Sequence, residues 1–107
     1  MGRIADPLVR RFATQHLPRL RRLYRPELVL IFGSRAKGEA LAESDMDRLV
    51  VSERFRGIPF LDRAATLLAE LDLPFSADVL CYTPEEFARK RQELGIVSQA
   101  LEEGVRL

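Results

Sequence analysis

The sequence has a single cysteine, Cys81, and a single histidine, His16. One cysteine cannot form an internal disulfide, and two such ligands are too few for a zinc finger or an iron–sulfur site. The apolar runs are only a few residues long, which excludes a transmembrane helix. The first residues, 1–6, match neither a signal peptide nor a myristoylation signal. We therefore expect a soluble, cytoplasmic protein.

The composition is that of a folded domain with an uneven distribution of charge. The 107 residues, 47% of them hydrophobic and 31% charged, predict one domain over residues 1–107. Residues 1–26 carry seven arginines and one acid, a net charge of +6, whereas residues 27–107 have a net charge of −5. The basic segment is either a solvated helix face or a surface that contacts RNA, a phosphate or an acidic partner.

Hydrophobic spacing and turn residues predict alternating helices and strands. Asp6 and Pro7 open an amphipathic helix, and Pro18 divides it into two short helices that meet near Leu17. The remaining predicted elements are strands at 28–32, 46–51 and 75–82, a turn with a short helix at 33–44, a loop at 54–59, and helices at 60–71, from Thr83 to about Leu94, and at 96–103. This order predicts a compact two-layer α/β domain.

Three carboxylates stand where a reaction centre is expected. Asp45 and Asp47 flank Met46 at the start of a predicted strand, and side chains two apart on a strand point to the same face. Asp78 lies inside the third predicted strand, where an unpaired carboxylate would be costly to bury. If these strands are neighbours, the carboxylates converge and need a cation between them. Carboxylate oxygens favour Mg²⁺ or Mn²⁺, so a metal site is expected here.

A candidate phosphate-binding turn precedes these carboxylates. Gly33 and Ser34 follow the apolar strand at 28–32, and Arg35 makes the turn basic. Glycine lets a phosphate approach the backbone, where free N–H groups and the serine hydroxyl can bind its oxygens. The segment is not a P-loop, because Glu39 stands where that motif requires lysine.

The turn and the carboxylates together form a spaced motif. A Gly-Ser pair at 33–34 is followed by ten residues and an Asp-x-Asp triplet at 45–47, with Asp78 about thirty residues further on. The pattern resembles the G-S-x10-D-x-D signature of the minimal nucleotidyltransferases, members of the DNA polymerase beta superfamily. The resemblance covers nearly the whole chain, including the segments 77–80 and 100–104.

The resemblance implies a nucleotidyltransferase fold, a small mixed β-sheet of at least three strands with helices packed on it. It also implies transfer of a nucleoside monophosphate, AMP from ATP, with release of pyrophosphate and with two bound ions, Mg²⁺ or Mn²⁺. Asp45, Asp47 and Asp78 would hold the ion that activates the acceptor hydroxyl. The first two would share the second ion, and Asp78 would also accept the proton. The nucleotide-binding residues that the resemblance implies are Gly33, Ser34 and Arg35.

The resemblance also bears on the acceptor. Larger relatives carry a second domain for it, whereas short members commonly pair with HEPN-domain proteins, helical RNases encoded beside them as toxins. This implies an antitoxin that adenylylates and silences such a partner, or a chain that borrows a surface from a second copy of itself. Two alternatives stay open: a non-catalytic module that masks its partner, and a small-molecule nucleotidyltransferase.

Arg48 departs from the family pattern, which usually has an apolar residue after the second aspartate. On a strand, its side chain points away from the neighbouring carboxylates. We therefore expect it to lie at an edge or to contact a partner, with its stem on the apolar surface. Whether the chain is fully active depends on how the fold accommodates this residue.

Overall fold

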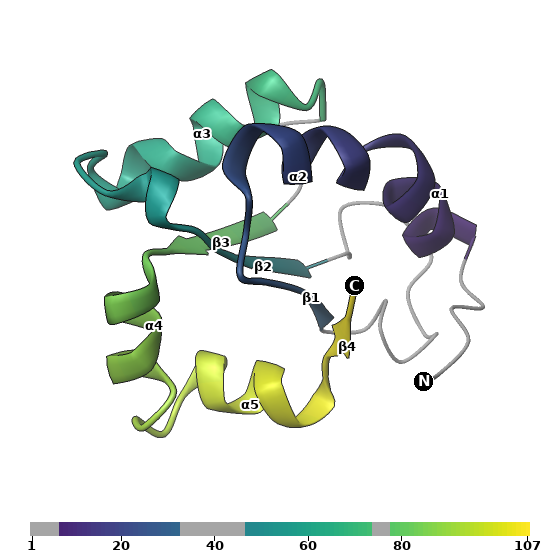
Figure 1. Ribbon diagram of the computed structural model, residues 1–107. Coiled ribbons are helices and arrows are strands. Elements are labelled where there is room, and N and C mark those ends of the chain that lie inside the picture. The colour runs from purple at the N-terminus through teal and green to yellow at the C-terminus, as the bar shows by residue number, and fades with distance from the viewer. Residues whose placement is uncertain (1–6, 33–46, 74–77) are drawn as a thin grey trace.

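The computed structural model describes residues 7–32, 47–73 and 78–107. Figure 1 shows a central sheet with helices above and below it. In chain order, the elements are α1 (Pro7–Gln15), α2 (Leu17–Tyr24), β1 (Leu28–Phe32), β2 (Asp47–Val51), the 3₁₀-helix η2 (Glu53–Phe55), α3 (Phe60–Glu70), β3 (Asp78–Tyr82), α4 (Pro84–Lys90), α5 (Ile96–Glu103) and β4 (Val105–Arg106). None of the helices in these ranges has the length and apolarity needed to cross a membrane.

The strands form a mixed sheet in the order β3-β2-β1-β4. β1 pairs antiparallel with both β2 and β4, whereas β2 and β3 run parallel. Two parallel neighbours need a crossover connection, and η2 and α3 lie in it. The expected mixed sheet of at least three strands is confirmed, and the structure adds β4 at one edge.

Helices cover both faces of the sheet. The core on one face joins α1, α2 and α3 to Val29 and Ile31 of β1, and the core on the other joins α4 and α5 to Leu28 and Leu30 (Figure 1). All five residues of β1 are therefore buried, which explains its continuous apolar run. The prediction of two layers is wrong, because helices pack on both faces and make the sheet the middle of three layers.

The N-terminal helix divides as predicted. α1 and α2 separate at His16, and Pro18 lies at the start of α2, where a missing N–H breaks no helical hydrogen bond. The expected helix start at Asp6 and the predicted turn and short helix at 33–44 lie outside the described residues.

Two element bounds differ from the prediction. The predicted loop at 54–59 overlaps η2, where the Ser52 hydroxyl accepts a hydrogen bond from the Arg54 N–H at 3.0 Å. α4 ends at Lys90 rather than near Leu94. The N–H groups of Gln92 and Glu93 donate to the carbonyls three residues earlier, at Arg89 and Lys90, which tightens the turn. The Leu94 side chain is 99% exposed, so no burial favours a longer helix.

Candidate active site

Asp47 and Asp78 lie beside each other at the same end of β2 and β3. The parallel register pairs these two residues directly. Register partners on adjacent strands project to the same face, and alternation along β2 puts Leu49 and Val51 on that face as well. The second and third strands are thus neighbours, as the convergence of their carboxylates requires. We call Asp47 and Asp78 the carboxylate pair.

The carboxylate pair is open to ligands from solvent. Asp78 is exposed and Asp47 is partly buried, and each is the first residue of its strand. The described part of the third strand starts at Asp78, and the rest of the strand predicted at 75–82 lies outside the described residues. Because the Asp78 side chain is exposed, it avoids the cost of burying a lone carboxylate.

The other predicted site residues follow or precede described strands. Phe32, the last residue of β1, pairs with Asp47, so β1 ends at the same end of the sheet as the carboxylate pair. The sequence continues from Phe32 into the Gly-Ser pair. The site residues outside the described ranges are Gly33, Ser34, Arg35 and Asp45.

Arg48 lies on the opposite face of β2 from the carboxylate pair. Its side chain is 0% exposed, and its guanidinium carbon lies 4.7 Å from the centroid of the Phe12 ring, within the layer of α1, α2 and α3. Its predicted direction, away from the carboxylates, agrees with this position. The expected edge or partner contact is wrong, because the guanidinium stacks on an aromatic face in the interior. The fold accommodates Arg48 without placing it among the carboxylates.

The carboxylate pair has a donor set that fits a divalent cation. Two carboxylates on one face supply hard oxygen ligands, which Mg²⁺ and Mn²⁺ prefer. Among the described residues, no group of three acidic, histidine or cysteine side chains gathers as a metal site. A complete site would need a third ligand from outside the described ranges.

An ion pair that sequence reasoning missed fixes the opposite end of β3. Arg63 of α3 is 6% exposed and donates to the Cys81 carbonyl at 3.2 Å. It also donates to Glu86 of α4, at 2.5 Å to Oε1 and 3.2 Å to Oε2. Hydrogen bonds from Arg63 lower the pKa of Glu86 to about 2. Glu86 completes a capping box with Thr83, so one carboxylate joins α3 and α4 across the end of β3.

Cys81 is buried, and its thiol is unreactive near neutral pH. Desolvation raises the pKa of its thiol to about 12, so the reactive thiolate is absent near neutral pH. It packs in the core with α1, α2 and α3. A cysteine nucleophile therefore plays no part in the candidate chemistry.

Clefts of about 350 and 450 Å³ lie among the described residues. The smaller is lined by Leu28 and Val29 at the start of β1, and the larger by Tyr82 at the end of β3. Leu28 pairs with Val51, which pairs with Tyr82, so both clefts lie toward the end of the sheet opposite the carboxylate pair. Neither cleft belongs to the candidate reaction centre.

Comparisons with known proteins identify a relative of this chain and a solved structure with a similar fold. The chain is 35% identical over 79 residues to a "probable protein adenylyltransferase MntA" of Haemophilus influenzae, a match that covers 72% of this chain and 69% of that protein. A crystal structure of a "putative nucleotidyltransferase" from Sulfolobus solfataricus superposes with a TM-score of 0.57 at 22% identity. That superposition covers 99% of this chain and 87% of the other, and it supports the fold.

The family assignment rests on an independent match along most of the chain. The nucleotidyltransferase domain family matches residues 13–107, which include β1, the carboxylate pair and every later element. The resemblance inferred from the Gly-Ser pair and the aspartates agrees with this match. The chain belongs to the nucleotidyltransferase domain family and is an enzyme of that class.

Proposed function

We propose that this protein transfers AMP from ATP to a hydroxyl group of a partner protein. The observation that carries the proposal is the in-register pairing of Asp47 and Asp78 at the open ends of parallel strands. The name of the Haemophilus relative, a probable protein adenylyltransferase, supports a protein as acceptor. The buried position of Arg48 favours an active enzyme over an inactive one, because the Arg48 side chain does not occupy the face that carries the carboxylates.

Two divalent cations, Mg²⁺ or Mn²⁺, would be held by Asp45, Asp47 and Asp78. When bound, such ions neutralise the triphosphate and lower the pKa of the acceptor hydroxyl. The carboxylates orient that hydroxyl toward the α-phosphorus, and positioning of this kind supplies much of the rate of phosphoryl transfer. The pairing of Asp47 with Asp78 on one face of the sheet supports this assignment.

The proposed reaction is a single displacement at the α-phosphorus of ATP. The acceptor oxygen forms a bond to the α-phosphorus, and the bond from that phosphorus to the oxygen bridging to the β-phosphate breaks. Pyrophosphate leaves with the bonding electron pair, and the hydroxyl proton passes to Asp78. Its exposed carboxylate is accessible to a hydroxyl that arrives on a second protein.

Gly33, Ser34 and Arg35 would bind the triphosphate. β1 ends at Phe32, whose register partner is Asp47, so this turn follows in the chain from a residue beside the carboxylate pair. Glycine permits close approach of a phosphate, and the serine hydroxyl and the arginine can donate to its oxygens.

Replacing Ser34 by alanine is expected to weaken ATP binding on the order of ten- to a hundredfold. The variant loses one charge-assisted hydrogen bond to phosphate, worth roughly 1.5–3 kcal/mol. Isothermal titration with ATP and Mg²⁺ measures the effect, and Ser98→Ala in α5 is the matched control. A large fall in the melting temperature of the nucleotide-free Ser34→Ala variant, with unchanged ATP affinity, would show that Ser34 only shapes the turn.

The acceptor is proposed to be a HEPN-domain RNase encoded beside this protein, which acts as its antitoxin. Incubating that neighbour with ATP, Mg²⁺ and this protein should add one or more AMP units to it, detected by mass spectrometry of the intact protein. The neighbour's RNase activity should fall in parallel. The same incubation with Asp47→Asn should leave its mass unchanged.

Two outcomes would contradict this acceptor. A neighbour that is bound and inhibited but keeps its mass would identify a masking module without catalysis. If the neighbour is neither bound nor modified, and a small hydroxyl compound instead receives AMP from ATP, the protein is a small-molecule nucleotidyltransferase. Each outcome is read from mass spectrometry of the reaction and native electrophoresis of the mixture.

A further inference from the structure

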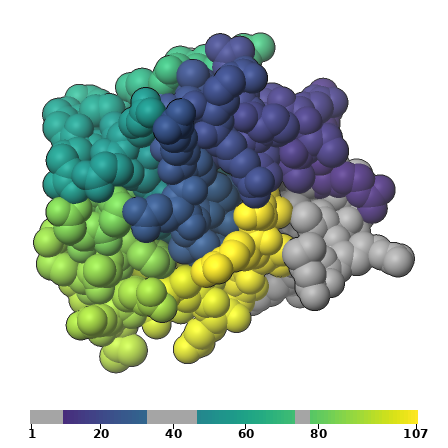
Figure 2. Space-filling model, in the orientation of Figure 1, coloured from purple at the N-terminus to yellow at the C-terminus, as the bar shows by residue number. Residues whose placement is uncertain are grey.

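A basic cleft lies between the end of α2 and the edge of the sheet formed by β1 and β4. Its volume is about 350 Å³. Figure 2 shows the dark-blue surface of α2 and the start of β1 meeting the yellow C-terminal segment in this region. The lining residues that matter here are Arg21, Arg25, Glu27, Leu28, Val29 and Arg106. We call this the arginine cleft.

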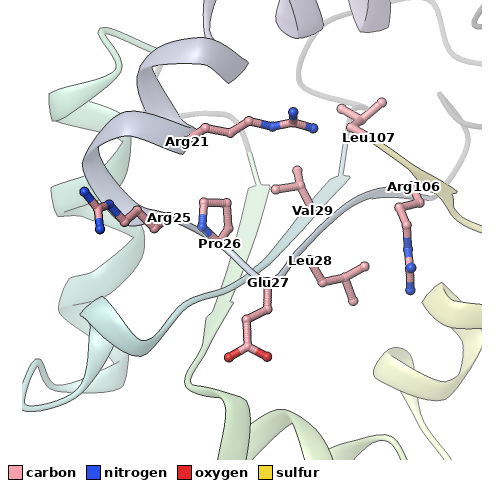
Figure 3. Close-up of a pocket in the computed structure, with 8 residues that line it drawn as sticks. All are labelled: Arg21, Arg25, Pro26, Glu27, Leu28, Val29, Arg106 and Leu107. Carbon is pink, nitrogen blue, oxygen red and sulfur yellow. The ribbon is translucent and has the colours of Figure 1, made fainter.

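The arginine cleft places charged side chains around the buried start of β1. Figure 3 shows the Arg21 side chain extending across one side toward Leu107, while Arg106 points to the opposite side. Leu28 and Val29 lie between these two side chains (Figure 3). Three arginines and one glutamate give the lining a formal charge of +2. Arg21 and Arg25 are exposed, as is Arg106, so their charges are available to a partner.

The fold brings these arginines together from distant parts of the chain. α2 ends at Tyr24, and Arg25 adopts the left-handed conformation, with φ of 44°, before Pro26 leads into β1. β4 pairs with β1 through Arg106 and Leu30, which carries Arg106 to the same edge. The cleft therefore exists only where the C-terminal strand is paired.

The arginine cleft is separate from the proposed reaction centre. Leu28 and Phe32 lie at opposite ends of β1, and Phe32 pairs with Asp47. Four residues of strand separate the two ends by roughly 13 Å. Arg21 belongs to the helix layer on one face of the sheet, whereas the carboxylate pair projects to the other. A nucleotide held at the carboxylates would therefore not occupy the arginine cleft.

We propose that the arginine cleft docks an acidic segment of a partner protein. Carboxylates of that segment would pair with the exposed Arg21 and Arg106. Glu27 would accept a hydrogen bond from a backbone N–H of the segment. The proposal rests on the proposed function for the identity of that partner as the AMP acceptor, but docking itself needs neither ATP nor metal.

The lining of the cleft favours protein over RNA. Proteins that bind single-stranded RNA stack its bases on aromatic side chains, and none of the residues lining this cleft, all of them described, is aromatic. A phosphate backbone would also be repelled by Glu27. An acidic segment of a protein can place its carboxylates beside the arginines and keep them away from this glutamate.

The experiment measures binding of two probes by fluorescence anisotropy, without ATP or metal. One probe is a labelled twelve-residue peptide of alternating Glu and Gly, and the other is a labelled single-stranded RNA of twelve nucleotides. The peptide should bind, and replacing both Arg21 and Arg106 by alanine should weaken it about thirtyfold. The matched control replaces Arg19 and Arg22, exposed arginines of α2 that do not line the cleft, and should weaken binding by no more than about threefold.

Three results would overturn the proposal: no binding of the peptide, equal weakening by both arginine pairs, or tighter binding of the RNA. Failure here is distinct from failure of the proposed transfer. Asp47→Asn should bind the peptide as the unmodified protein does, while losing the ability to add AMP to its neighbour. If the protein transfers AMP but does not bind the peptide, the proposed reaction stands and only the proposed docking surface is refuted.

Discussion

Replacing Asp47 by asparagine is expected to reduce the rate of AMP transfer by roughly a hundredfold or more while the chain stays folded. The substitution removes one negative charge from the carboxylate pair and changes little volume, so the pairing of β2 with β3 should persist. Initial rates of pyrophosphate release measure the loss of transfer, and thermal unfolding of the metal-free protein checks that the chain stays folded.

The same loss of transfer is expected for Asp45→Asn, which removes another ligand of the proposed ions. The matched control is Asp62→Asn, which removes the same charge from an exposed position in the first turn of α3. It should leave the transfer rate within about a factor of two. Near-normal transfer by Asp47→Asn in the presence of Mg²⁺ would refute the assignment of the ions to these carboxylates.

Replacing Glu86 by glutamine should destabilise the fold by roughly 2–4 kcal/mol at pH 7, because it leaves the Arg63 guanidinium buried without its counter-charge. Glutamine also serves as the second residue of a capping box, so the start of α4 is preserved. The expected loss of stability therefore comes from the missing negative charge. Urea unfolding at pH 7 measures this loss. The matched control is Glu85→Gln in the same helix turn, whose partner Arg56 is exposed, and it should cost less than about 1 kcal/mol.

The same ion pair predicts how stability depends on pH. The pKa of Glu86 in the folded protein is about 2, below its usual value of 4.5, so its contribution is present above pH 4.5 and is lost as the pH falls toward 2. The difference in unfolding free energy between the unmodified protein and Glu86→Gln should therefore shrink between pH 5 and pH 2. A difference that stays constant over this range would show that the Arg63–Glu86 charge pairing contributes nothing.

Local patterns predicted the elements well where burial and periodicity agree. The five-residue apolar run at 28–32 coincides with β1, and the glycines at 95 and 104 correctly bound the helix predicted at 96–103, which is α5. Alternation also put Asp47 on the face of Leu49 and Val51. These features depend only on residues that are close together in the sequence, so they can be predicted from the sequence pattern.

The features that the sequence concealed depend on contacts between distant elements. Nothing in residue type separates the buried pair of Arg63 and Glu86 from the exposed pair of Arg56 and Glu85, because only packing decides which pair is enclosed. The buried position of Arg48 also depends on contacts between distant elements, so residue type alone did not predict it. An arginine among apolar neighbours suggests an edge, and stacking on Phe12 from another element makes the interior acceptable. β4 is two residues long, too short for alternation to identify.

The parallel pairing of β2 with β3 also determines when the reaction centre can form. Asp47 and Asp78 are 31 positions apart in the chain, and parallel strands cannot be joined by a hairpin. The two carboxylates therefore meet only after the chain has passed through η2 and α3 and the crossover has closed, which is a contact of high sequence separation. A nascent chain whose helices and first hairpin have formed but whose crossover is still open has no assembled carboxylate pair. Competence for transfer thus depends on the pairing of the edge strand β3 with β2.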